Sequence, residues 1–147
     1  MFRKTYRYRQ VYLLLISIVL LHWHIDSISA QTMFPTNVGD KAKYAAMIET
    51  PKAYLSGVCI MYHDNDGEIK GSIFNEFGIS ALDFSYSEKK DKVKLHHVFK
   101  MMNKWYIKKV LRHDIREIIH QLKEGNGVYH NKRFHINYQF TPLETSE

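Results

Sequence analysis

Two different hydrophobic periods divide this chain of 147 residues, and they limit what it can fold into. From Tyr54 to Phe99, apolar residues recur mostly at every second position between short polar turns, which is typical of β-strands. Between Asn103 and Lys123 they recur in steps of three and four, which is typical of an amphipathic helix. Alternation returns near the C-terminus, so we expect strands on both sides of one helical region.

The alternating region predicts a meander of about five strands. A short apolar stretch at 44–49 stops before Pro51, and a nearly continuous one at 54–62 predicts a strand covered on both faces. The turn at 64–67, Asp-Asn-Asp-Gly, separates it from the next strand. Three later sets of residues are each expected to share one face of a strand. These sets are Ile69, Ile73 and Phe77; Leu82, Phe84 and Tyr86; and Val93, Leu95, His97 and Phe99.

The helical region predicts one or two short helices. Asp114 and Glu117 form a pattern like a capping box, so the alternative to one helix is two helices with a break near His113. The Gly-Asn-Gly sequence at 125–127 should end the helical region. The residues expected to face the sheet are Val110, Leu111, Ile115, Ile118 and Leu122.

One last strand is expected where Phe134, Ile136, Tyr138 and Phe140 alternate with polar residues before Pro142. The predicted fold class is therefore α+β, with a curved antiparallel sheet packed on one or two short helices. The sheet consists of the meander and the returning C-terminal strand. We place a single α+β domain at 43–141, a flexible lead-in at 31–42 and a C-terminal tail at 142–147.

The first 30 residues predict export. Four basic residues precede a mainly apolar run at 11–21, and Ser27, Ser29 and Ala30 follow, which is the layout of a secretory signal peptide. This run has eleven residues, whereas a helix that crosses the bilayer needs about 20. We expect cleavage after Ala30 and a periplasmic or secreted protein, with an uncleaved N-terminal membrane anchor as the alternative.

The charge of the chain argues against nucleic-acid binding. The first 30 residues carry four of the 21 Lys and Arg and one of the 15 Asp and Glu, so their removal lowers the net charge from +6 to +3. A modest positive charge on an exported protein does not favour a nucleic-acid partner. The recurrence of Lys104, Lys108, Arg112 and Arg116 forms a basic stripe, interpreted mainly as a solvated helix face. Its functional alternative is attraction to anionic lipid headgroups or acidic glycans.

No sequence motif points to catalysis. Glycine-rich phosphate loops, nucleophile elbows and the two-histidine helical zinc motif are absent. Cys59, the only cysteine, lies between apolar residues and is interpreted as a small buried hydrophobe. His96 and His97 are adjacent in a strand and are expected on opposite faces, so they should not share a metal ion. We predict no catalytic residue, no metal site and no cofactor.

Aromatic residues are unusually frequent for a small domain, at 14% of the chain. A well-packed aromatic core is the first explanation. A curved sheet could equally use large apolar residues to line a groove for an acyl chain. The residues predicted to line such a groove are Phe74, Phe84, Tyr86, Phe99, Phe134 and Tyr138.

Several segments together resemble a known group of proteins. Phe-Asn-Glu-Phe-Gly at 74–78, Leu-Asp-Phe at 82–84, and Val98-Phe99 leading to Asn103-Lys104 and Asp114 are similar to uncharacterised exported proteins and lipoproteins of Gram-negative bacteria. That group is similar in architecture to the lipoprotein-carrier (LolA/LolB-like) half-barrel. The resemblance covers about 80 residues, 54 to about 122, and implies a curved sheet wrapped over helices. It supplies no catalytic residues, and no lipid-accepting cysteine lies near Ala30.

Three functions are open at this point. The leading hypothesis is an exported, non-enzymatic binding module for an acyl chain, lipoprotein or other apolar ligand. The alternatives are a structural or envelope-interaction protein with a filled core, and an extracytoplasmic hydrolase with scattered acids and histidines. The expected partners are a lipid or lipoprotein, or an envelope protein, with contact to a membrane surface and no nucleic acid. A continuous apolar groove would favour the first, a filled core the second and clustered titratable residues the third.

Overall fold

The computed structural model of this protein describes residues 34–143. The predicted signal peptide at 1–30 and most of the predicted tail lie outside these residues. The predicted lead-in is described from Phe34 onward. Phe34 is buried, and the backbone N–H of Asn37 donates a hydrogen bond to Asp40 Oδ2 at 2.8 Å.

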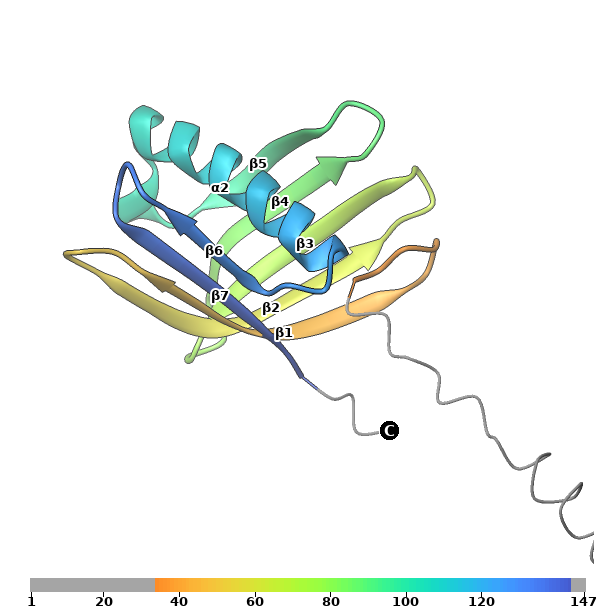
Figure 1. Cartoon of the computed structure of the whole chain (residues 1–147), viewed down its shortest axis with the longest axis horizontal. Coiled ribbons are helices and arrows are strands. Elements are labelled where there is room, and N and C mark those ends of the chain that lie inside the picture. Colours follow the sequence, from red (N-terminus) through yellow and green to blue (C-terminus); the bar gives the residue numbers. More distant parts are fainter. Residues whose placement is uncertain (1–33, 144–147) are drawn as a thin grey trace, which may run out of the picture. The chain divides into compact units, whose positions relative to one another are not determined.

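Within the described residues, seven antiparallel strands form one curved sheet, and a single long helix lies across its concave face (Figure 1). This confirms the predicted α+β class with a curved antiparallel sheet. The strands lie in the order β5-β4-β3-β2-β1-β7-β6, so the chain forms a five-strand meander and then adds a hairpin beside β1. The elements are β1 (Lys41–Glu49), β2 (Tyr54–His63), β3 (Glu68–Asn75), β4 (Ser80–Ser87), β5 (Lys92–Val98), the short 3₁₀ helix η1 (Lys100–Met102), α2 (Trp105–Lys123), β6 (Val128–Asn131) and β7 (Ile136–Pro142).

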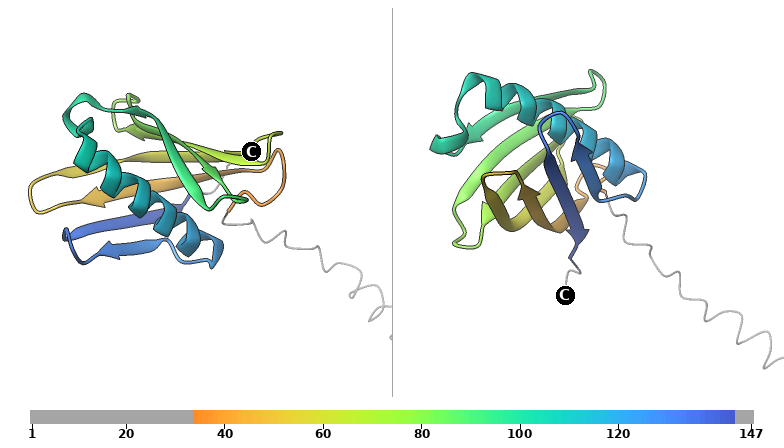
Figure 2. Two further views of the ribbon diagram at one scale, coloured as in Figure 1. Left: turned by 90° about the horizontal axis from the view of Figure 1, so that it is seen from above. Right: turned by 60° about the vertical axis from the view of Figure 1, so that its left-hand side comes forward.

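The core lies between the concave face and α2. The strand register places Tyr44, Cys59, Ile73 and Leu82 side by side across β1 to β4, and each is at most 1% exposed. Because side chains alternate between the faces of a strand, every second residue of these strands lies on the concave face. The two further views in Figure 2 show α2 against this face.

The helix packs as its period predicts but is continuous. Leu111, Ile115, Ile118 and Leu122 are buried against the sheet. Of the two alternatives, the one with a break near His113 is wrong, since α2 runs unbroken for 19 residues. Asp114 does not begin a second helix. It lies inside α2, where β6 and β7 supply partners for its carboxylate.

The C-terminal strand is a hairpin rather than one strand. β6 pairs with β7, and Phe134, expected in the last strand, lies in the turn between them. Only four residues form β6. Such a short strand shows no alternation over a useful length, which explains why sequence periodicity did not predict it.

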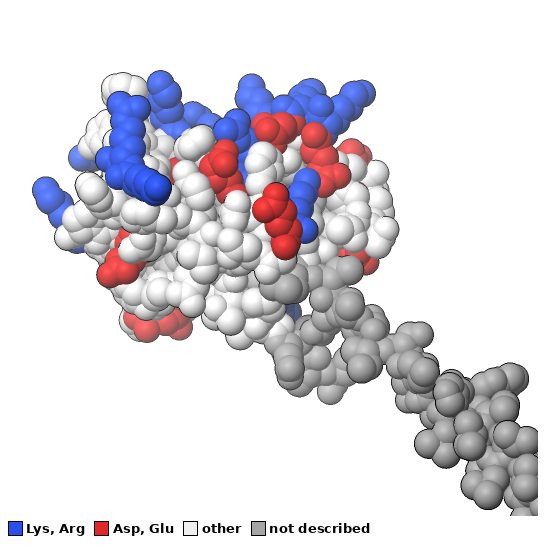
Figure 3. Space-filling model, in the orientation of Figure 1, with Lys and Arg blue, Asp and Glu red and all other residues white. Residues whose placement is uncertain are grey.

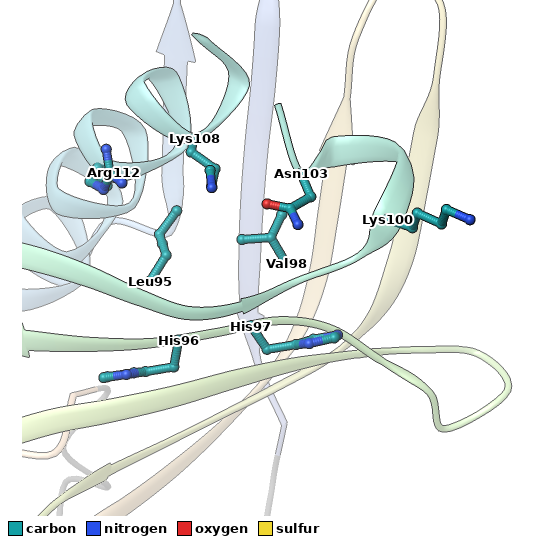
Figure 4. Close-up of a pocket in the computed structure, with 8 residues that line it drawn as sticks. All are labelled: Leu95, His96, His97, Val98, Lys100, Asn103, Lys108 and Arg112. Carbon is teal, nitrogen blue, oxygen red and sulfur yellow. The ribbon is translucent and has the colours of Figure 1, made fainter. Parts of the chain in front are cut away.

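A β-bulge changes which residues of β5 share a face. Asp83 pairs with His97 and Phe84 with Leu95, so His96 is the extra residue. His97 therefore does not share a face with Leu95, contrary to the prediction, and Figure 4 shows both histidines on the side of β5 opposite Leu95. His96 forms a hydrogen bond with Ser85 there, with 3.0 Å between Nε2 and Oγ.

Three smaller expectations are also wrong. Phe77 lies in the β3–β4 turn and is 79% exposed, and Phe99 lies after the end of β5. β2 is covered on one face only, because Val58 and Tyr62 on its outer face are exposed.

The turn at 64–67 is confirmed: Asp64 and Glu68 close it, and Gly67 adopts a φ of 76°, which a glycine accommodates without strain.

Candidate functional site

An apolar cavity of about 660 Å³ opens at one end of the concave face. Here the first half of α2 faces the β1–β2, β3–β4 and β6–β7 turns, at the left of Figure 1. A few polar residues lie among its lining, at 50, 52, 75 and 80. The rest of the lining consists of Ile48, Pro51, Ala53, Tyr54, Leu55, Ile79, Ala81, Leu82, Phe99, Met101, Met102, Tyr106, Ile107, Val110, Leu111, Phe134, Ile136 and Tyr138.

The cavity has a buried floor and an exposed rim. Leu82 and Tyr138 at the floor are each 1% exposed. The rim carries large apolar side chains that face water, which is costly and unusual for so many neighbouring residues. These rim residues are Tyr54, Ile79, Phe99, Met101, Tyr106 and Phe134. Trp105, 76% exposed, stands edge-to-face with Tyr106 at 5.9 Å between ring centroids and extends this rim.

Three of the four polar residues at the cavity, all except the exposed Lys52, form side-chain hydrogen bonds with neighbouring residues. Thr50 Oγ1 accepts a hydrogen bond from the backbone N–H of Ala53 at 2.8 Å. Asn75 Oδ1 accepts hydrogen bonds from the backbone N–H groups of Phe77 and Ile79, at 3.0 and 2.9 Å. The Ser80 hydroxyl donates to Asp83 at 2.8 Å. Because these groups already have partners, the cavity mainly offers apolar surface to a ligand.

A buried carboxylate behind the floor holds one wall in place. Asp114 is fully buried; its Oδ2 accepts a hydrogen bond from the Tyr138 hydroxyl at 2.8 Å, and its Oδ1 accepts one from Asn131 Nδ2 at 2.7 Å. Asn131 Oδ1 in turn accepts hydrogen bonds from the backbone N–H groups of Arg133 and Phe134. Asp114 thus connects α2 to the turn that carries Phe134 to the rim.

Burial dominates the electrostatics of this cluster. Desolvation raises the pKa of Asp114 above its ordinary value, although the hydrogen bonds from Tyr138 and Asn131 act in the opposite direction. Desolvation, together with the nearby Asp114, also raises the pKa of the Tyr138 hydroxyl. Tyr138 therefore stays protonated and continues to donate its hydrogen bond.

The structure divides the six aromatic residues predicted to line a groove. Phe99, Phe134 and Tyr138 line the cavity. Phe84 and Tyr86 are buried in the core and do not line it. The ring of Phe84 lies over Gly71, where an added Cβ would approach its Cζ to 2.2 Å, so this ring fills a space that a side chain would otherwise occupy.

Phe74, the sixth residue, is on the other side of the sheet. It follows the fully buried Ile73 in β3, and successive side chains of a strand point to opposite faces.

Some lining residues that were not predicted do have a recognisable pattern in the sequence. Met101 and Met102, like Ile79, are apolar residues between the longer elements, where polar residues are expected, whereas Tyr106 lies in the first turn of α2.

A second cluster joins Tyr86, Asp91 and His120 away from the cavity. The Tyr86 hydroxyl donates to Asp91 Oδ1 at 2.9 Å, and His120 Nε2 lies 2.7 Å from the same oxygen. These hydrogen bonds, with that of His120 the strongest, lower the pKa of Asp91. No serine, threonine or cysteine bonds to this cluster within the described residues, so it has no partner that resembles an activated nucleophile.

Other groups that could act in catalysis are dispersed or buried. Cys59 is fully buried on the concave side, and desolvation raises the pKa of its thiol, which disfavours the reactive thiolate. Among residues 34–143, no three His, Cys, Asp or Glu side chains lie in positions that could hold a metal ion.

Within residues 34–143, no helix has the length and apolar character needed to span a membrane.

Comparison with known proteins adds no family to this description. No protein family, no curated protein and no solved structure matches the chain.

Proposed function

We propose that this protein is a non-enzymatic binding module that holds an acyl chain or a comparable apolar ligand in the cavity beside α2. The observation that carries the proposal is a cavity with a buried apolar floor and a solvent-facing apolar rim. Its volume of about 660 Å³ falls within the range of about 300 to 1,000 Å³ that is usual for small-molecule sites.

The exposed rim gives a second reason for this proposal. Met101 is 75% exposed and Tyr106 is 49% exposed, and both border the cavity. A ligand that enters the cavity would remove such surface from water, at about 25 cal/mol for each Å² of apolar area. A lipid or lipoprotein would supply a suitable chain. This ligand class agrees with the resemblance to lipoprotein carriers, and both the resemblance and the export of the chain stay predictions.

The test uses N-phenyl-1-naphthylamine, a neutral probe that fluoresces in apolar surroundings. We expect it to bind the full chain in a saturable manner and to lose most of its binding to Val110→Trp, because Val110 is a half-buried lining residue. Val58→Trp is the matched control, since Val58 is 36% exposed on the outer face of β2 and lines no part of the cavity.

Two results would contradict the proposal. The first is the absence of saturable binding by the folded protein. The second is equal probe affinity for Val110→Trp, Val58→Trp and the natural protein. Either result would favour the alternative that the rim is an interaction surface of a structural envelope protein.

A further inference from the structure

A second, basic pocket lies between β5 and the beginning of α2. It has a volume of about 370 Å³. Leu95 and Val98 form its apolar base, and Asn103, Lys108 and Arg112 lie over them on the same side of β5 (Figure 4). Lys and Arg side chains also gather on the surface of this part of the molecule (Figure 3).

In the part of the chain that the structure describes, the charges in this pocket have no partner of opposite sign. Among the described residues, no acid forms an ion pair with Lys108 or Arg112, and none lines the pocket. The next basic residue of the stripe behaves differently: Arg116 pairs with Glu117 at 2.9 Å and lies 4.0 Å from Asp91. The stripe predicted from the sequence therefore divides into a neutralised part and an unpaired part.

The start of α2 adds to the positive potential. No acidic residue occurs in its first turn, and no side chain caps its N-terminus. The first backbone N–H groups of a helix lack partners within the helix and give that end a partial positive charge. Asn103 and Lys108, which line the pocket, lie just before and just after these groups.

The basic pocket and the apolar cavity border the same short segment. Val98, Lys100 and Asn103 line the basic pocket, whereas Phe99, Met101 and Met102 line the apolar cavity. Segment 98–103 is therefore a wall that the two pockets share, and it brings the unpaired positive charges beside the apolar cavity.

We propose that the natural ligand of this protein is an amphiphile with an anionic headgroup, which Lys108 and Arg112 bind while its alkyl chain occupies the apolar cavity. This inference rests on the proposed function, because it assigns a headgroup to the ligand of that cavity. Two cations and an amide suit a phosphate or carboxylate group, and an arginine can bind such a group through two N–H donors.

The test compares decyl phosphate, decanol and inorganic phosphate as competitors of N-phenyl-1-naphthylamine or as ligands in calorimetry. Decyl phosphate and decanol share a chain and differ in the headgroup. We expect decyl phosphate to bind about tenfold more tightly than decanol at low salt, with the advantage decreasing as ionic strength rises. Inorganic phosphate alone should bind at least about a hundredfold more weakly than decyl phosphate, because it lacks the buried chain.

Substitutions test whether this pocket causes the tighter binding of decyl phosphate. In Lys108→Gln/Arg112→Gln, decyl phosphate should lose about tenfold in affinity and decanol should be unchanged. The control is Lys90→Gln/Lys109→Gln, which removes two exposed charges outside the pocket and should keep the preference for decyl phosphate. Unchanged decanol binding also shows that each variant is folded.

Three results would overturn this inference. The first is equal affinity for decyl phosphate and decanol. The second is a preference that survives in Lys108→Gln/Arg112→Gln. The third is inorganic phosphate binding as tightly as decyl phosphate, which would indicate a site for a free anion. Each leaves decanol binding intact, whereas failure of the proposed function abolishes decanol binding as well.

Discussion

At the scale of single residues, Asp114 shows most clearly how a polar group supports an apolar site. Its carboxylate is fully buried and accepts hydrogen bonds from Tyr138 and Asn131. Because its pKa is raised in the folded state, the folded protein holds this proton more tightly than the unfolded chain does. The contribution of this protonation to stability is therefore fully present below the unfolded-state pKa of about 4 and is lost as pH rises through the folded-state pKa.

Replacing Asp114 should show how much its hydrogen bonds contribute to the free energy of unfolding. We expect Asp114→Ala to lower the free energy of unfolding by about 3 kcal/mol, because it leaves the Tyr138 hydroxyl and the Asn131 amide without partners in the core. Asp114→Asn keeps an acceptor oxygen and should cost less than about 1 kcal/mol at pH 7, since it also removes a buried charge. Urea unfolding of both variants measures this difference. Equal losses would show that the hydrogen bonds do not stabilise this wall.

The composition of the chain predicted that aromatic residues line a groove, but it did not predict correctly which residues do so. The abundance of aromatics predicted a groove lining, and Phe99, Phe134 and Tyr138 do line the cavity. Period-two alternation cannot distinguish a residue that fills the core from one that borders a cavity, because both point to the same face. Phe84 and Tyr86 share the inner face of β4 with Leu82, yet only Leu82 reaches the cavity.

At the scale of elements, α2 is attached near its C-terminus by side chains from the β4–β5 hairpin. Near its C-terminus, His120 forms a hydrogen bond with Asp91 of the β4–β5 hairpin, and Lys123 pairs with Glu88 at 2.5 Å. Lys123 Nζ also lies 4.8 Å from the centroid of the Tyr86 ring. These contacts hold the hairpin against the helix while the opposite end of α2 borders the cavity.

This attachment predicts a specific pH dependence. The pKa of Asp91 is lowered by His120 first and by Tyr86 second, so its stabilising effect is present above the unfolded-state pKa of about 4 and is lost as pH falls through the folded-state pKa. We expect Asp91→Asn to melt at a lower temperature than the natural protein at pH 6. The difference should shrink below about pH 4. Asparagine also tolerates the φ of 46° at this position.

Melting curves at a series of pH values decide this prediction. Lys90→Gln, in the same hairpin turn, controls for the loss of a surface charge. A melting difference that is constant across the acid range would show that the charge of Asp91 does not stabilise the hairpin.

Most elements could be predicted from the sequence because their periods are long and regular. The meander and the helix between Asn103 and Lys123 follow from alternation and from the 3.6-residue period. The exceptions depend on contacts distant in the sequence. Asp114 and Glu117 resemble a helix start locally, but burial against β7 keeps the helix continuous. The bulge at His96 likewise depends on the partner strand β4.

At the scale of the described domain, the concave face is divided between a filled half and an open half. Ile115, Ile118, Ile119 and Leu122 of α2 are each at most 1% exposed and pack the filled half. Ile107 and Val110, earlier in the same helix, border the cavity instead. A packed half stabilises the fold, and the open half leaves apolar surface available for a ligand.

The most direct test of apolar binding is the affinity of neutral n-alkanols from hexanol to decanol, measured by displacement of N-phenyl-1-naphthylamine from the full chain. Each added CH₂ should enter the cavity and contribute about 0.8 kcal/mol, so the dissociation constant should fall about fourfold per carbon. Val110→Trp should weaken or abolish this dependence, whereas Val58→Trp should keep it. An affinity that does not change with chain length, or a dependence that is unchanged in Val110→Trp, would contradict binding of an alkyl chain in this cavity.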